Sequence, residues 1–504
     1  MTTYFIDSNA TYAENATNNG TTKETPWGGI GGIQHALALV AADEDIYGRS
    51  GTDFDLSKLV MLAASSTTGA GLVLGAEVAE YTPAVPPTVK GDAEGHIVYV
   101  TGNTYYVEVH TGTWTTNQSV CLKSDPGNHY TNAAALTRPG LKPVTAGTSN
   151  AAKVTIIGTK NDIDWTEDGT QVVIDGHTTG DYGIQPLLAW YEVRNVRITR
   201  TYQYWGWWTE KTSLLINCTA DHCYRGFSGA GVYRHCLSYS NTQFGFYPDS
   251  AANAHYALCV AYGNGSSGWA GLTYNSSVIM CLSYDNGGQG FTIVDGFGSC
   301  IVGCIINGNT LDGILAIGTG HTRVLGCEIT NNGLGVDGAN YYGIKSNTAQ
   351  NLDEDYNVFY CNGLNSGSTD TRDRAYALVG AHSVHADDDD DQGYTNEGGN
   401  VFTPTAAAIG RRVSVTLPDG LNTVYITAGL TPAAVPPPAG EVVLNGTAYE
   451  GATGVVAASG SRVDAAVGDV KAGVKYGDPD SQLTGTLVAG GGVGVRRGGA
   501  LRGA

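Results

Sequence analysis

The segment Cys281-Leu-Ser-Tyr-Asp-Asn286 recurs with small variations along the middle of this 504-residue chain. Four other segments, beginning at Cys236, Cys259, Cys304 and Cys327, also place an asparagine five residues after a cysteine. From Cys236 onward, successive cysteines of this set are separated by 22 or 23 residues. A fixed period of this length indicates a repeat architecture in which each unit stacks on the next.

The residues within the period favour short strands joined by turns. A leucine-rich repeat has a similar period, but the leucine positions are not kept here, and β-branched residues, Asn and Gly dominate. Coils of short strands lie about 4.8 Å apart, so equivalent side chains stack on one another. The predicted fold class is therefore all-β: a right-handed parallel β-helix solenoid with a short N-terminal capping helix and a small C-terminal module.

Stacking accounts for both repeated residue types. A buried free thiol behaves as a small hydrophobe, and stacked thiols point the same way, which disfavours disulfides. The spacings of Cys300 to Cys304 and of Cys218 to Cys223 match no zinc signature. The asparagines predict a ladder of stacked turn amides. The predicted structural ladders comprise Cys218, Cys236, Cys259, Cys281, Cys304 and Cys327, and Asn241, Asn264, Asn286, Asn309 and Asn332.

The repeat also predicts which residues face outward. Glu328 directly follows Cys327 and is a poor interior residue, so the second residue after each cysteine is expected to share the inward face. The third residue then points outward. This assignment predicts an exposed aromatic ladder of Tyr239, Tyr262 and Tyr284.

The N-terminal segment carries a family resemblance. Residues Ile30, Ile33 and Leu37 have helical spacing, which predicts a short helix covering the open end of the solenoid. This opening resembles that of pectate-lyase-like right-handed parallel β-helix proteins, and Ile97-Val-Tyr-Val100 resembles their first strand after the cap. The likeness covers roughly residues 1–365 and implies the fold, which hosts lyases, hydrolases, phage tailspikes and adhesins. The matching motifs are Tyr4-Phe-Ile-Asp7, Asn19-Gly20-Thr21, Pro26-Trp27 and Ile33-x-x-Ala36-Leu37.

Changes in composition divide the rest of the chain. The Pro-rich stretch from Thr431 to Pro438 reads as a stiff linker. Beyond it, Leu444-Asn-Gly-Thr-Ala-Tyr-Glu-Gly resembles short C-terminal modules of phage tail and bacterial surface proteins. The predicted regions are 1–45 (N-terminal cap), 46–365 (parallel β-helix), 366–430 (irregular or terminal β region), 431–440 (linker), 441–488 (small C-terminal module) and 489–504 (flexible tail).

Charge and hydropathy exclude some classes of partner. The chain carries 47 acidic and 27 basic residues, a net charge of -20, which disfavours nucleic-acid binding. No stretch has the apolar length of a membrane span. Met1 is followed within a few residues by Asp7, without a basic region or an apolar core, so no cleaved signal peptide is expected.

Catalytic candidates in the repeat are acidic. Asp249 and Asp295 are 46 residues apart, which is two coils, or very roughly 9–10 Å. This is the upper limit for the two carboxyl groups of an inverting glycosidase. Neither residue lies in a recognisable catalytic motif, and acidic residues are common in turns. Residues 236–320 contain no Lys or Arg, so the combination of acids and a basic residue used by calcium-assisted lyases is missing.

The acidic run from Asp387 to Asp391 is the candidate metal site. His382 and His385 lie upstream of this run. Because Ca²⁺ binds carboxylate oxygens, calcium is the one candidate ion. Consecutive acids cannot easily all face one ion, so a solvated loop is the alternative. No other cofactor is expected. The candidate ligands are Asp387, Asp389 and Asp391.

A cluster of aromatic residues predicts a contact surface. Aromatic rings on a solenoid wall can stack on sugar rings or contact another subunit. Trp207 aligns with Phe227 and is instead expected to pack inside. The predicted contact residues of the cluster are Tyr202, Tyr204, Trp205 and Trp208.

These observations favour a non-enzymatic appendage of a virion or cell surface, such as a phage tail or head fibre or a spike-like adhesin. Its expected partners are other copies of the chain, with a trimer as one arrangement, host glycans, and other virion or surface proteins bound through residues 441–488. Two alternatives are a polysaccharide lyase or glycoside hydrolase, and a self-assembling filament or coat protein that uses the tyrosine ladder. The expected location is a virion or an extracellular surface.

Overall fold

The computed structural model describes most of residues 2–363 and several short strands beyond them. The described residues are 2–9, 20–23, 25–49, 53–68, 72–81, 90–102, 104–114, 119–132, 140–159, 165, 167, 169–178, 182–248, 253–296, 298–318, 320–333, 341–346, 352–355, 357–363, 374–375, 383–385, 394–395, 403–404, 412–416, 423–427, 475–476 and 483–484.

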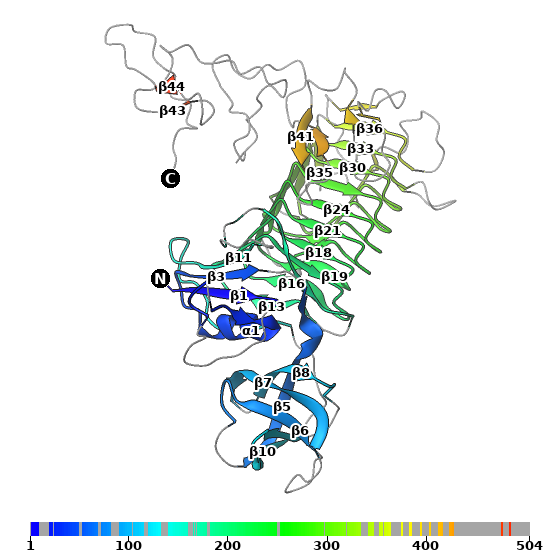
Figure 1. Ribbon diagram of the computed structural model, residues 1–504. Coiled ribbons are helices and arrows are strands. Elements are labelled where there is room, and N and C mark those ends of the chain that lie inside the picture. The colour runs from blue at the N-terminus through cyan, green and yellow to red at the C-terminus, as the bar shows by residue number, and fades with distance from the viewer. Residues whose placement is uncertain are drawn as a thin grey trace.

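Three long parallel sheets wind along the chain as a β-helix, which confirms the predicted all-β parallel solenoid (Figure 1). Each strand pairs with its equivalent one coil later, and the register follows the sequence repeat: Leu237 pairs with Val260, and Val260 with Leu282. We call the sheets walls 1, 2 and 3.

Wall 1 consists, in spatial order, of β2 (Trp27–Gly28), β1 (Thr3–Asp7), β3 (Glu44–Arg49), β11 (Val154–Gly158), β14 (Tyr191–Arg194), β17 (Leu214–Ile216), β20 (Val232–Arg234), β23 (His255–Ala257), β26 (Ser277–Ile279), β29 (Ser299–Val302), β32 (Thr322–Leu325) and β35 (Leu352–Asp355). Wall 2 consists of β4 (Phe54–Asp55), β12 (Val172–Asp175), β15 (Val196–Thr199), β18 (Thr219–Asp221), β21 (Leu237–Tyr239), β24 (Val260–Tyr262), β27 (Leu282–Tyr284), β30 (Ile305–Asn307), β33 (Glu328–Thr330), β36 (Val358–Tyr360) and β38 (Val384–His385). Wall 3 consists of β13 (Ile184–Leu187), β16 (Trp205–Thr209), β19 (Arg225–Gly229), β22 (Phe246–Tyr247), β25 (Trp269–Leu272), β28 (Phe291–Val294), β31 (Ile314–Ile317), β34 (Ile344–Ser346) and β37 (Arg374–Ala375).

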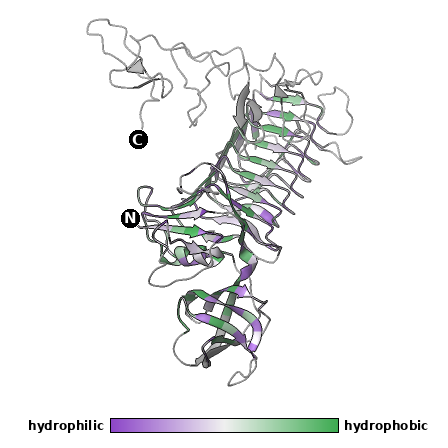
Figure 2. Ribbon diagram, viewed as in Figure 1, coloured by the Kyte–Doolittle hydropathy of each residue, from purple (hydrophilic) through white to green (hydrophobic). Residues whose placement is uncertain are grey.

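The core of the solenoid is a set of stacked columns. Figure 2 shows hydrophobic segments that recur from coil to coil. On the inward side of wall 3, the rings of Phe227, Phe246, Trp269 and Phe291 stack with centroids 4.9, 4.7 and 4.7 Å apart. Such offset stacking adds to the stabilisation from burial alone. The core is therefore rigid and continuous, and it fixes the positions of the outward side chains.

The N-terminal segment forms the first strands of wall 1 and one helix, α1 (Gly29–Leu39), at the end of the solenoid (Figure 1). Tyr4 stacks on Trp27 at 5.5 Å. Gly20 has a φ of +67°, and a Cβ there would lie 2.4 Å from the Trp27 ring, so this position requires glycine. No described helix has the length and hydrophobicity that crossing a membrane would require.

An antiparallel barrel interrupts the early coils, which corrects one expectation. Ile97-Val-Tyr-Val100 lies in a barrel strand that pairs antiparallel with its neighbours, so it is not the first strand of the solenoid. The buried Glu108 of the barrel accepts a hydrogen bond from the backbone N–H of Gly31 at 3.1 Å and so joins the barrel to the start of α1. The barrel consists of β5 (Leu59–Thr68), β6 (Glu77–Tyr81), β7 (Lys90–Thr101), β8 (Thr104–Thr111), β9 (Ser119–Leu122) and β10 (Asp125–Asn132), and the one-turn helix η1 (Leu56–Lys58) precedes it.

Beyond the solenoid the structure describes three antiparallel strand pairs. The predicted region boundaries stay predictions, and residues 431–440 and 489–504 lie outside the described residues. The pairs are β39 (Tyr394–Thr395) with β40 (Thr403–Pro404), β41 (Arg412–Thr416) with β42 (Thr423–Thr427), and β43 (Lys475–Tyr476) with β44 (Leu483–Thr484).

Candidate functional site

The asparagine column is a hydrogen-bonded ladder inside the corner that follows wall 2. The Asn241 Nδ2 group donates to Asn264 Oδ1 at 2.9 Å, and the same bond recurs between every successive pair up to Asn332. The ladder extends one coil further than predicted, to Asn362 at 3.0 Å. These amides are buried, so they hold the coils in register and leave the outer walls to make contacts.

The six predicted cysteines form a second buried column. All are fully buried, and all are free thiols. Their Sγ atoms lie near backbone carbonyls, as Cys281 Sγ does to the Ile279 oxygen at 3.4 Å. The nearby thiol of Cys223 is also buried, and burial raises its pKa to about 11. Fully buried thiols such as these are packing residues rather than nucleophiles.

The outer side of wall 2 is largely closed. Tyr239, Tyr262 and Tyr284 point outward and stack at 5.0 and 4.9 Å, but Tyr284 is only 2% exposed. The expectation of an exposed ladder is therefore wrong for Tyr284. The physical reason is a second hydrophobic cluster on this wall, in which the tyrosines pack beside Leu282 and Ile305.

The outer side of wall 3 carries exposed aromatic rings. Tyr204 is 43% exposed and stacks on Tyr182 with centroids 4.5 Å apart and planes 2° apart. The ring centroid of Trp208 lies 6.1 Å from that of Tyr182. Trp205 stacks on Tyr247, with the two centroids 5.5 Å apart. We call the following set the aromatic platform: Tyr182, Tyr204, Trp205, Trp208, Tyr224, Phe244 and Tyr247, with Arg225 among them.

Arg225 lies at the centre of the platform. Its guanidinium carbon is 4.4 Å from the Trp205 ring centroid and 5.7 Å from that of Tyr247. Its Nε donates to Gln243, whose Nε2 donates in turn to the Tyr224 hydroxyl at 2.6 Å. The cation is thus held by ring faces and by one amide, and bonding through Nε leaves the Nη edge for another acceptor.

A groove of about 360 Å³ continues the platform toward the later coils. Phe244 and Tyr247 form its aromatic side. Ser267, Gln289 and Thr292 supply hydroxyl and amide groups, and Ser267 Oγ donates to Gln289 Oε1 at 3.0 Å. The residues that line this groove are all uncharged. Aromatic rings beside hydroxyl and amide groups are the combination that contacts the apolar faces and hydroxyls of sugars.

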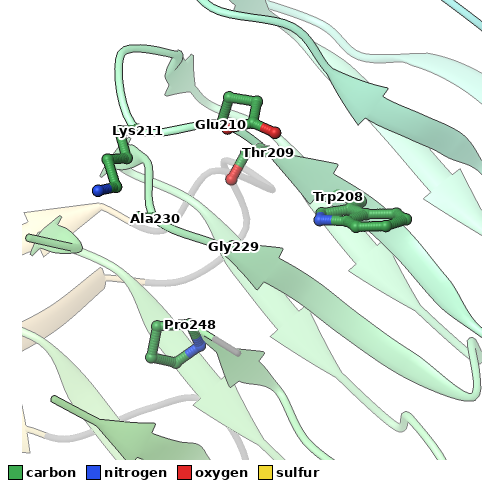
Figure 3. A pocket seen from close by; sticks show the side chains of 7 residues that line it. All are labelled: Trp208, Thr209, Glu210, Lys211, Gly229, Ala230 and Pro248. Carbon is green, nitrogen blue, oxygen red and sulfur yellow. The ribbon is translucent and has the colours of Figure 1, made fainter. Parts of the chain in front are cut away.

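A smaller hollow of about 140 Å³ borders Trp208 of the platform (Figure 3). Figure 3 shows Trp208 at one side and Glu210 and Lys211 on the adjoining loop, with Pro248 from a later coil across from them. Two hollows therefore border the platform, one at Trp208 and one at Phe244 and Tyr247.

The other candidates have mixed outcomes. Tyr202 is 58% exposed, as the contact prediction requires, whereas Trp205 is only 7% exposed because Arg225 and Tyr247 cover it. Asp295 is half-buried at the end of β28, with its carboxylate against Gly318 of the next coil. Asp249 lies outside the described residues, so the structure does not place the Asp249 and Asp295 pair.

The predicted calcium ligands Asp387, Asp389 and Asp391 also lie outside the described residues. Within the described part of the chain, no group of three or more His, Cys, Asp or Glu side chains is arranged to hold a metal ion.

An acid–base cluster on wall 2 was not predicted. Asp221 is fully buried and accepts hydrogen bonds from Arg197 Nε at 2.7 Å and from Thr199 Oγ1 at 3.0 Å. Its Oδ2 also lies 2.7 Å from Nδ1 of His222, whose side chain is 57% exposed. A similar pair lies in the two coils before Asp221: Arg200 Nε donates to the buried Asp175 at 2.9 Å. The wall therefore presents an imidazole oriented by a buried carboxylate.

Sequence reasoning found the first aromatic coil but missed its partners in later coils. The signal for them was present: Phe244 directly precedes Gly245, which belongs to the glycine column of the repeat, and Tyr247 follows two residues after it. Arg225 likewise precedes Gly226. The residue before each of these glycines points outward on wall 3, so this column could have been read from the repeat once the wall was known.

No family model and no curated protein matches the chain. Among solved structures, pectate lyase Pel9A resembles it at 14% identity and a TM-score of 0.30, over 73% of this chain and 66% of that one. A glycoside hydrolase resembles it at 10% identity and a TM-score of 0.38, over 76% and 96% of the two chains. The tailspike protein gp49 from Pseudomonas phage LKA1 resembles it at 12% identity and a TM-score of 0.29, over 64% and 61%. The chain thus spans just under two thirds of the pectate lyase, and the likeness is one of fold alone.

Proposed function

We propose that this chain is a carbohydrate-binding β-helix that contacts glycans through the aromatic platform and groove of wall 3. The main support for this proposal is the set of outward rings around Arg225. These rings continue into an uncharged groove lined by hydroxyl and amide groups. Ring faces stack on the apolar faces of sugars, and the groove residues can exchange hydrogen bonds with sugar hydroxyls. Because the platform is built on the stacked core, it requires little ordering on binding.

Affinity electrophoresis through gels that contain single polysaccharides tests this proposal. Wild-type protein should be retarded by at least one glycan, and Trp208→Ala should lose most of that retardation because a stacking face is removed. Leu39→Ala is the matched control, since Leu39 is an exposed hydrophobic residue on α1, away from the platform. Retardation that is equal in all three proteins would contradict the proposed site.

The setting that we propose is an appendage of a virion or cell surface, such as a fibre or spike-like adhesin. In it the chain associates with further copies of itself, a trimer being one arrangement, and residues 441–488 bind other virion or surface proteins. Deleting residues 435–504 should abolish assembly and leave the solenoid folded, as measured by sedimentation and circular dichroism. Normal assembly after the deletion would rule out this attachment.

A polysaccharide-cleaving enzyme is the second candidate function, and the Asp221–His222 pair favours it. When Nδ1 of His222 donates to Asp221, the exposed Nε2 presents a lone pair that can act as a general base. Release of new sugar ends from a polysaccharide panel, lost in His222→Gln and kept in His255→Gln, would support this function. His255 is the control because it is an exposed histidine on wall 1. Absence of such release in the wild type would exclude it.

A further inference from the structure

Two histidine rings on the surface of the barrel face each other through nitrogen atoms. His96 lies in β7 and His110 in the neighbouring strand β8, and their Nδ1 atoms are 3.1 Å apart. The ring planes are inclined at 46°, with centroids 4.6 Å apart. The two side chains are 18% and 21% exposed, so water and small ions can reach the pair.

A carboxylate lies at the other ring nitrogen of each histidine. Glu108 Oε2 is 3.1 Å from His110 Nε2, and Glu77 Oε1 is 3.7 Å from His96 Nε2. An ionised carboxylate can only accept hydrogen bonds, so both positions favour a proton on Nε2. Each Nδ1 then carries a lone pair, and the two lone pairs converge. Histidines that bind a metal are held in this way, with the second ring nitrogen donating to a carboxylate.

The cation that stabilises two converging lone pairs is either a shared proton or a metal ion. Burial lowers the pKa of His96, and His110 and Lys123 act in the same direction. Glu77 and Glu108 act in the opposite direction but do not reverse the shift, so a proton is disfavoured near neutral pH. A tetrahedral ion with bonds of about 2.0–2.1 Å to nitrogen holds two ligand nitrogens about 3.3–3.4 Å apart. This separation is close to that of the two Nδ1 atoms.

Glu108 connects the histidine pair to the first helix. Its Oε1 accepts a hydrogen bond from the Gly31 N–H at 3.1 Å, and the first turn of α1 contains no acidic residue of its own. A Cβ on Gly31 would lie 2.5 Å from the other oxygen, so glycine leaves room for the carboxylate. The start of the helix therefore fixes Glu108, and Glu108 in turn orients the ring of His110.

We propose that His96 and His110 bind one divalent transition-metal ion of the zinc class through their Nδ1 atoms. Imidazole nitrogen suits Zn²⁺, Ni²⁺ and Cu²⁺, whereas Ca²⁺ prefers oxygen ligands. Within the described residues no third His, Cys, Asp or Glu completes the set, so water supplies the remaining ligands. The ion cross-links β7 and β8 beside the point where the barrel meets α1. This site is independent of the glycan contacts on wall 3.

Isothermal titration calorimetry of the full chain with ZnCl₂, without a polyhistidine tag, tests the site. The wild type should bind one more zinc ion than His96→Gln or His110→Gln, because each variant lacks one of the two nitrogen ligands. His321→Gln is the matched control, since His321 is also an exposed histidine beside a carboxylate, 3.4 Å from Asp353. Calcium should give no such difference. Equal zinc stoichiometry in all four proteins would overturn the proposal.

Glu108→Gln tests how the rings are oriented. The amide oxygen is needed by the Gly31 N–H, so the amide nitrogen faces His110 and requires a lone pair on its Nε2. The ring proton then moves to Nδ1 and blocks the metal. Zinc should bind about ten- to a hundredfold more weakly, while circular dichroism shows an unchanged fold. Unchanged affinity would contradict the role of this carboxylate.

A protection experiment on the wild type needs no variant. Diethyl pyrocarbonate modifies accessible imidazole nitrogens, and mass spectrometry locates the modified residues. Zinc should protect His96 and His110 and leave His321 as reactive as before. Equal modification of the pair with and without zinc would overturn the metal site, even if one of the variants failed to fold.

Discussion

Walls 2 and 3 are formed by the same coils, yet their outer sides have opposite characters. On wall 2, Leu282 and Ile305 are fully buried and Tyr284 nearly so. On wall 3, Tyr204 is 43% exposed, and the groove offers hydroxyl and amide groups. The difference shows that a repeating solenoid assigns separate roles to its walls: one adds stability, and the other is available for contacts.

The inner ladder beside wall 2 should be the most sensitive to substitution. The side-chain oxygen of Asn286 accepts hydrogen bonds from both the backbone N–H and the side-chain Nδ2 of Asn264. Its Nδ2 donates to Asn309, so Asn286→Ala removes all three bonds. Leaving these buried groups unpaired should cost about 3–5 kcal/mol of unfolding free energy. Urea denaturation measures the loss, and Gln289→Ala, which removes an amide from the outer side of wall 3, is the matched control. Equal losses in the two variants would contradict the division of roles.

The closed outer side of wall 2 should respond next. Leu282→Ala empties a fully buried position and should cost about 2–4 kcal/mol. The corresponding truncation on wall 3, Thr292→Ala, should stay within about 0.5 kcal/mol because Thr292 borders an open groove. Thermal unfolding of both variants compares the walls directly, and a large loss in Thr292→Ala would show that wall 3 is also part of the stabilising structure.

The buried carboxylate of Asp312 on wall 3 should make the stability of the protein depend on pH. Burial raises the pKa of Asp312 to about 6, while Lys345 and the Tyr342 N–H act in the opposite direction. Because this pKa is above the unfolded value near 4, the linked stability is fully present below about pH 4 and is lost as pH rises through about 6. The loss amounts to about 3 kcal/mol at most.

Asp312→Asn should flatten this part of the pH profile of the melting temperature. Asp53→Asn, which makes the same change at an exposed position, serves as the control. An Asp312→Asn protein that keeps the wild-type slope between about pH 4 and pH 6 would show that Asp312 does not titrate in this range.

The platform should contribute least to stability. Arg225→Met removes an outer cation that lies over rings, which should change the free energy of unfolding by about 1 kcal/mol or less. The same variant should lose most of its glycan retardation. Denaturation and affinity electrophoresis on one preparation compare the two effects, and a variant that unfolds easily but binds normally would reverse the assignment.

The parts that sequence could predict are those that repeat. The Cys281 and Asn286 columns recur at a fixed period, so stacking follows from the spacing alone. The ladder residue Asn362 was missed because the coil before it is 30 residues long, which hides the period. The barrel was missed because antiparallel pairing, such as that of Ile97 with Val107, leaves no period in the sequence.

The site was less predictable because it depends on contacts between coils and on what covers each wall. Tyr284 and Tyr204 look alike in sequence, and only packing distinguishes the buried residue from the exposed one. Arg225 acquires its role from Trp205, Gln243 and Tyr247, which belong to neighbouring coils. Their proximity follows from the register of wall 3, which the sequence pattern did not provide.

The asparagine ladder has a direction. In each bond to an asparagine side-chain oxygen of the ladder, the donor belongs to the earlier coil and the accepting Oδ1 to the later one, from the Cys223 N–H to Asn241 and onward to Asn362. A chain leaving the ribosome from its N-terminus therefore completes the amide bonds of each coil only when the next coil emerges. The growing solenoid always ends in one coil with open donors, and the next segment synthesised supplies their acceptor. The direction of these bonds therefore matches the order in which the coils are synthesised.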